Sequence, residues 1–83
     1  MYHDAPRRGT LLCENRTMRS VIDHFGEDVA TEVVDAKHFR ATVDVAPTPP
    51  FFSWVFTFGG AIRIEEPAEV LEKMRDMAAW LHT

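Results

Sequence analysis

The chain has 83 residues, of which 46% are hydrophobic and 27% are charged, and its formal net charge is -4. This length suits one small domain, and the composition is that of a folded globular protein. The negative charge argues against a nucleic-acid-binding surface, because phosphate contacts need a clustered positive field. Cys13 is the single cysteine and cannot form an internal disulfide, and the sequence contains no long apolar run. We therefore expect a cytoplasmic protein without a membrane partner.

The N-terminal third predicts a lead-in, a strand and a helix. Residues 1–9 are mixed in polarity and predict a linker or a disordered lead-in, so the folded domain is expected over residues 10–83. A short β-prone run over 10–13 precedes Asn15, a candidate helix N-cap. Apolar residues then recur at helical spacing: Met18, Val21, Ile22 and Phe25. Gly26 is expected to end this amphipathic helix.

The middle of the chain predicts a β-hairpin. Residues 30–35 form a β-prone run, and residues 38–45 alternate strictly in polarity. On one face of the second strand we expect the side chains of Phe39, Ala41, Val43 and Val45. On the other face we expect those of His38, Arg40, Thr42 and Asp44. The short connection over 35–37 joins the two strands.

The last third predicts helix, strand and helix. The aromatic run from Phe51 to Phe58 follows two prolines and ends at two glycines, which favours a short helix over 49–58. A strand remains the alternative, because phenylalanine and tryptophan also favour strands. Residues 61–65 alternate as a strand, and Glu66-Pro67 opens a final helix. Its apolar stripe comprises Val70, Met74, Met77, Ala78 and Leu81.

This order predicts an α+β, ferredoxin-like split βαβ sandwich (βαββαβ) with an additional C-terminal helix. Right-handed crossovers place both main helices on one face of the sheet. The other face is the first candidate for function, although a solvated charged face is also common in antiparallel sheets. It is expected to present Leu12, Glu14, His38, Arg40, Thr42, Asp44, Arg63 and Glu65.

Several segments together resemble a known family. They are Val21–Val29, His38-Phe39-Arg40 with its alternating strand, Phe51–Gly60 with central Trp54, Ile62-Arg63-Ile64, and Glu66-Pro67 before the last helix. Over nearly all of the chain after Thr10, they look like the C-terminal extension of bacterial WYL-domain transcriptional regulators. Such regulators combine a DNA-binding winged helix-turn-helix, a WYL domain thought to sense a ligand, and this extension.

The resemblance implies an accessory module that contributes to dimerisation and to coupling between domains. The implied partners are the WYL domain of the same or a partner chain and, weakly, a second copy. The Trp-Tyr-Leu tripeptide and a helix-turn-helix are absent from this sequence. Neither DNA binding nor the WYL ligand site can therefore be carried over to its residues. The alternative function is a free-standing small-molecule-binding module of ferredoxin-like fold.

No catalytic or metal site is expected, and no cofactor. The four histidines lack metal-ligand spacing, and neither serine lies in a nucleophile elbow. An acylphosphatase-like enzyme would bind phosphate in a loop after the first strand. Here Glu14-Asn15-Arg16 lacks the glycines that let backbone amides converge on an anion. An RNA-recognition module would need aromatic residues on the open sheet face, whereas Phe39 falls on the apolar face.

The candidate site is therefore an interaction surface. Its predicted members are Arg40, Trp54, Arg63, His38, Glu14 and Glu65. Both arginines are expected near Glu14 and Glu65, and a twofold-related copy could pair these charges reciprocally. Trp54, expected at the edge of the sheet, would supply the apolar anchor.

Overall fold

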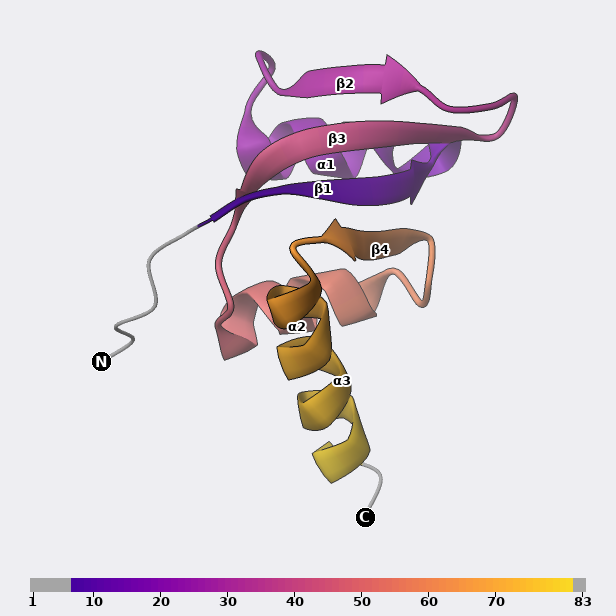
Figure 1. Cartoon of the computed structure of the whole chain (residues 1–83). Helices are drawn as coiled ribbons and strands as arrows, with labels where there is room; N and C mark the ends of the chain where they lie inside the picture. The colour runs from indigo at the N-terminus through magenta and orange to yellow at the C-terminus, as the bar shows by residue number, and fades with distance from the viewer. Residues whose placement is uncertain (1–6, 82–83) are drawn as a thin grey trace.

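The computed structural model describes residues 7–81, apart from the side chains of Trp80 and Leu81. Within this range a four-stranded antiparallel sheet packs against three α-helices, which confirms the predicted α+β class (Figure 1). The strands are β1 (Arg7–Glu14), β2 (Ala30–Val33), β3 (His38–Val45) and β4 (Ile62–Glu66). The helices are α1 (Met18–Phe25), α2 (Pro49–Thr57) and α3 (Ala68–Leu81), and the 3-10 turn η1 (Asn15–Thr17) precedes α1.

The sheet has the strand order β2-β3-β1-β4. The two eight-residue strands, β1 and β3, lie side by side at its centre, paired from Arg7 opposite Val45 to Glu14 opposite His38. β4 pairs with the outer edge of β1, with an irregularity in register between Thr10 and Leu11. β2 pairs with β3 as the predicted hairpin. The chain's first strand is therefore an inner strand, which holds the two halves of the fold together.

The first strand begins earlier than predicted. Arg7, Arg8 and Gly9, which we assigned to the lead-in, pair with the last residues of β3. Their polarity resembles that of a linker. However, β3 is long enough to form backbone pairs with these three residues as well. Gly9 itself is buried, and a Cβ atom there would lie 2.3 Å from the carbonyl oxygen of Glu66. The rest of the predicted lead-in, residues 1–6, lies outside the described residues.

The expected N-cap role of Asn15 is wrong. α1 begins at Met18, after η1, and no side chain caps it. The side-chain amide of Asn15 instead donates to the carbonyl of Ala36 at 3.0 Å, while its backbone N–H donates to the carbonyl of Lys37 at 2.9 Å. Asn15 therefore fastens the end of β1 to the β2–β3 turn, a long-range role that local sequence cannot reveal.

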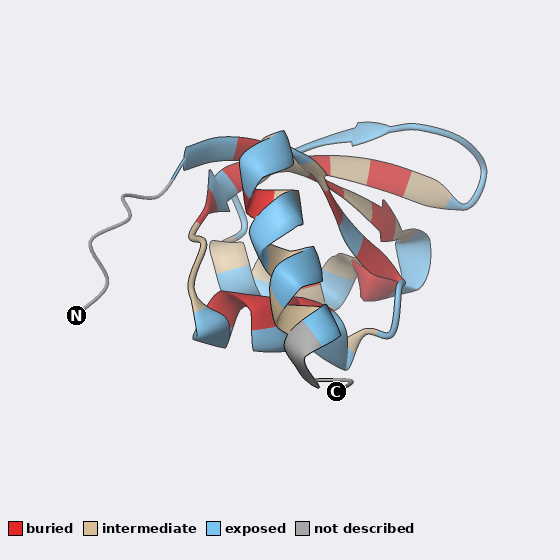
Figure 2. Ribbon diagram, turned by 60° about the horizontal axis from the view of Figure 1, so that its bottom comes forward, coloured by how far each residue is buried: buried red, intermediate tan, exposed pale blue. Residues whose placement is uncertain are grey.

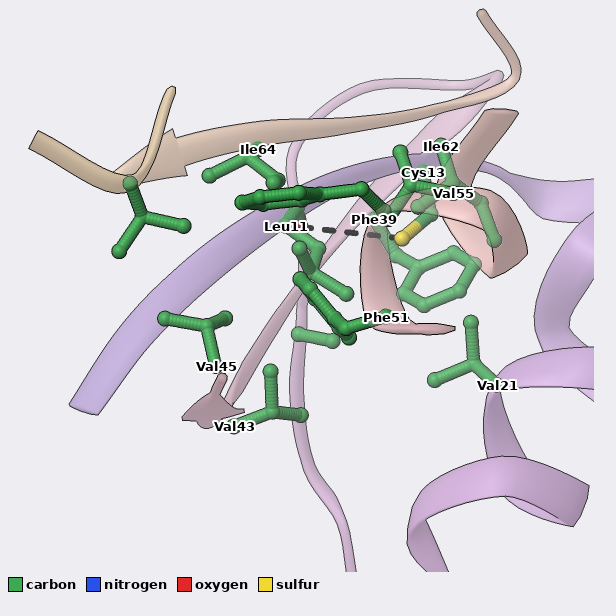
Figure 3. Close-up of a cluster of buried hydrophobic side chains, with 13 residues drawn as sticks. Leu11, Cys13, Val21, Phe39, Val43, Val45, Phe51, Val55, Ile62 and Ile64 are labelled. Carbon is green, nitrogen blue, oxygen red and sulfur yellow. Dashed lines mark hydrogen bonds between the residues drawn. The ribbon is translucent and has the colours of Figure 1, made fainter. Parts of the chain in front are cut away.

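One hydrophobic cluster fills the space between the sheet and the helices (Figure 3). The strands contribute the alternating residues Leu11, Cys13, Phe39, Ala41, Val43, Val45, Ile62 and Ile64. The helices contribute Val21 from α1, Phe51, Phe52 and Val55 from α2, and Val70 from α3. Because every helix packs into the same cluster, all three cover one face of the sheet. The predicted alternation of β3 is confirmed.

The other predicted elements differ from the structure mainly in length. β2 ends at Val33, two residues before the expected end, and all four of its residues are exposed (Figure 2). The aromatic run is helical, and α2 ends one residue before the predicted Phe58. In α1, Gly26 takes a φ of 106° and follows the last helical residue, as expected. In α3, Val70 is buried and Met74 and Met77 pack against the core.

Candidate interaction surface

The face of the sheet that the helices leave uncovered, here called the open face, presents the side chains that alternate with the core. The strand register fixes which of them are neighbours. Leu12 lies opposite Arg40 on one side and opposite Arg63 on the other. Glu14 lies opposite His38. The backbone pairing therefore brings the predicted site residues of three strands onto one surface.

Arg40 forms the main polar contact across this face. Its Nε donates to Oε1 of Glu65 at 2.7 Å, and its Nη1 donates to Oε1 of Glu32 at 3.0 Å. A longer bond of 3.4 Å joins Nη2 to Oε2 of Glu65. The hydrogen bond with Glu65, followed by that with Glu32, raises the pKa of Arg40 above its ordinary value. One guanidinium thus links strands β2, β3 and β4.

This arrangement changes the role expected for Arg40. Its charge is balanced by Glu32 and Glu65 of the same chain, so it need not reach a second copy to find a carboxylate. Glu32 was not among the predicted site residues. Its position directly opposite Arg40 in the hairpin is a cross-strand signal that the sequence could have supplied.

A second polar group lies at the end of the open face, where β1 meets η1. Oε1 of Glu14 accepts from Nε of Arg16 at 2.8 Å, and this bond lowers the pKa of Glu14. Oδ1 of Asp35 accepts from the backbone N–H of Lys37 at 2.8 Å and lies 2.9 Å from Nδ1 of His38. The bond with Lys37 is the main cause of a lowered pKa at Asp35. The sequence analysis did not predict Arg16, Asp35 and Lys37. They lie in the segments that connect β1 to α1 and β2 to β3, where strand alternation gives no information.

Two hollows meet at Glu14 and His38. The larger, about 480 Å³, is lined by Glu14, Asn15, Arg16, Ala36, Lys37 and His38. The smaller, about 120 Å³, is lined by Leu12, Glu14, His38, Gly60, Ala61 and Arg63. Both lie at the same end of the sheet and have charged side chains in their lining. This end of the open face is therefore hollowed.

Arg63 is exposed, and its Nε donates to the carbonyl of Gly60 at 3.1 Å. Among the residues that the structure describes, no carboxylate forms an ion pair with it. Its terminal amines therefore face solvent on the edge strand β4. Of the two arginines predicted for this face, Arg63 is the one that forms no ion pair with a described carboxylate.

The expected position of Trp54 at the sheet edge is wrong. Its ring stacks on His24 at a centroid distance of 4.2 Å and meets Phe25 edge-on at 5.5 Å, so it joins α2 to α1 in the helical layer. Phe51 and Phe58 of the same aromatic run also contact it. Trp54 therefore packs on the side of the sheet opposite to the charged candidates and cannot anchor the open face.

Cys13 shows no sign of a reactive thiol. It is fully buried, its Sγ donates to the carbonyl of Leu11 at 3.7 Å, and desolvation by burial raises its pKa to about 11 (Figure 3). The thiol therefore stays protonated at neutral pH.

Over residues 7–81, the structure contains no group of side chains suited to hold a metal ion and no helix long and apolar enough to cross a membrane.

Comparison with known proteins agrees with the resemblance noted in the sequence. The family model described as the WCX domain matches residues 6–81, nearly the whole chain. Searches of curated proteins and of solved structures gave no match. The matched range covers every strand and helix of the fold, including the open face and both hollows. The chain belongs to the WCX domain family, the C-terminal extension of WYL-domain regulators.

Proposed function

We propose that this domain is an accessory module of a bacterial, cytoplasmic WYL-type transcriptional regulator. It contributes to dimerisation and to coupling between domains, and it neither binds DNA nor catalyses a reaction. The observation that carries this proposal is the open face of the sheet. An antiparallel sheet with one uncovered face and a free arginine on that face offers a surface that another domain can cover.

We also propose that the fold is a ferredoxin-like split βαβ sandwich with an added C-terminal helix. The chain order of strands and helices supports it, as does the sheet order β2-β3-β1-β4 with β1 and β3 at the centre. In such an arrangement α3 is the extra element. It starts directly after the edge strand β4 and adds Val70 to the core.

The two arginines of the open face have different parts in the proposed contact. Arg40 is held by Glu32 and Glu65 and keeps the centre of the face in one conformation, which lowers the entropy cost of docking. Arg63 is exposed at the edge and forms no ion pair with a described carboxylate. The matching surface of the WYL domain, or of a second copy, should therefore carry a carboxylate opposite Arg63.

Arg63→Glu is expected to weaken binding of the chain to the WYL domain of its regulator by about tenfold or more, because attraction becomes like-charge repulsion at a docked surface. Calorimetric titration gives the affinity. Light scattering at rising protein concentration is expected to show weak self-association of the native chain and less of it in the variant.

The matched control is Arg75→Glu, which makes the same charge change at an exposed position of α3, away from the open face. Equal losses in the two variants would point to net charge and not to this surface. Undiminished WYL binding by Arg63→Glu would rule out the open face as the docking site. A native chain that stays monomeric at the highest concentration would remove dimerisation from the proposal.

The isolated chain is expected to cause no sequence-specific shift of duplex DNA at moderate ionic strength. Its net charge is -4, and weak binding at very low salt should disappear as counterions are added. Gel-shift titrations over a series of salt concentrations, with promoter and scrambled duplexes, measure this. Binding that is both sequence-selective and resistant to salt would contradict the accessory role.

A further inference from the structure

The larger hollow at the end of the open face has two walls from distant parts of the sequence. One wall is the end of β1 with η1, and the other is the turn between β2 and β3. Asn15 ties them together through its backbone bond to Lys37 and its side-chain bond to Ala36. The hollow is therefore formed by the fold itself, and its two walls are held at a fixed separation.

Nitrogen donors come from both walls. Arg16 uses Nε to bind Glu14, which orients the guanidinium and leaves both terminal amines available. Lys37 lines the opposite wall, and none of the described carboxylates forms an ion pair with its ammonium group. His38 donates its Nδ1–H to the carboxylate of Asp35, so Nε2 donates only when the imidazole is doubly protonated. A chain with net charge -4 thus gathers cationic side chains around one hollow.

We propose that this hollow binds the phosphate group of a small ligand, with Arg16, Lys37 and the doubly protonated form of His38 as its donors. Three donor groups from two walls suit the several oxygens of a tetrahedral phosphate better than the two oxygens of a planar carboxylate. The volume of about 480 Å³ falls in the range of small-molecule sites and exceeds the size of phosphate alone. Glu14 is then placed to accept a hydrogen bond from a hydroxyl of the rest of the ligand.

This site differs from the phosphate loop that the sequence excludes. A backbone cradle after β1 would need glycines, and Glu14-Asn15-Arg16 has none. Here the donors are side chains, and the second wall comes from residues more than twenty positions away. The site is also independent of the proposed regulator function, since it needs neither a second copy nor a WYL domain.

The test is an NMR titration of the isotopically labelled chain at constant ionic strength. The probes are inorganic phosphate, adenosine monophosphate and acetate. Saturable shifts are expected at the amides of Asn15, Arg16, Lys37 and His38 with both phosphate probes. Adenosine monophosphate should bind more tightly than inorganic phosphate, because it fills more of the hollow. Arg16→Gln and Lys37→Gln should each weaken binding about tenfold, the effect of losing one charge-assisted hydrogen bond.

Arg19→Gln is the matched control, because it removes the same charge from an exposed position of α1 that does not line the hollow. It should leave the affinity unchanged. If Arg19→Gln lost as much phosphate affinity as Arg16→Gln, the effect would come from the overall charge of the chain, and the proposed site would be wrong. Acetate binding as tight as phosphate binding would overturn the phosphate assignment. The absence of saturable shifts at tens of millimolar phosphate would overturn the proposal as a whole.

Discussion

Phe39→Ala is expected to leave most of the protein unfolded in water. Phe39 lies on the central strand β3, is 3% exposed and belongs to the core cluster. Replacing a buried phenylalanine by alanine costs about 3–5 kcal/mol, through lost burial and the cavity left behind. A single core in a domain of this size supplies about the same amount in total. Urea denaturation followed by far-ultraviolet circular dichroism measures the loss.

Val33→Ala provides the control within the same hairpin. Val33 lies directly opposite Phe39 in the register but is 84% exposed, so the change should stay within about 0.5 kcal/mol. Phe39→Leu, which keeps part of the buried volume, gives a variant with a measurable transition if the alanine variant is unfolded throughout. Equal midpoints for the native chain and Phe39→Ala would mean that this face of β3 does not form the core.

Gly9→Ala is expected to destabilise the domain by about 1–3 kcal/mol or more, which is the usual cost of overpacking. A Cβ atom at Gly9 would lie 2.3 Å from the carbonyl oxygen of Glu66 and 2.9 Å from Cδ of Pro67 and from Cγ2 of Val45. The nearest of these atoms belongs to the backbone and cannot turn aside. β1 and the end of β4 must therefore move apart. Thermal or urea denaturation reports the change in the free energy of unfolding.

Arg8→Ala is the neighbouring control, since Arg8 is exposed and its contact with Asp44 is a 3.6 Å surface ion pair. It should have little effect. If Gly9→Ala were as stable as the native chain, residues 7–9 would not pair with β3, and a lead-in up to Gly9 would be supported instead.

The candidate surface was predictable where it depends on strand alternation. Period two in residues 38–45 places Arg40 and His38 opposite the core face, and the structure has both there. What alternation does not reveal is which charges are already paired. Arg40 is neutralised by Glu32 and Glu65, whereas Arg63 on the edge strand β4 forms no ion pair with a described carboxylate. Pairing depends on strand order and on side-chain reach, which are properties of the assembled sheet.

The sequence by itself determined the α+β class, the aromatic helix, the hairpin and the resemblance to WYL regulators, because these follow from periodicity, proline and glycine positions, and local motifs. The tertiary structure alone decided the rest. It extended β1 to Arg7, moved Asn15 from a helix cap to a tie with the β2–β3 turn, and packed the partly buried Trp54 against α1. Each of these outcomes depends on contacts between residues far apart in the chain. Their free energy outweighs the weak local preferences that a sequence pattern records.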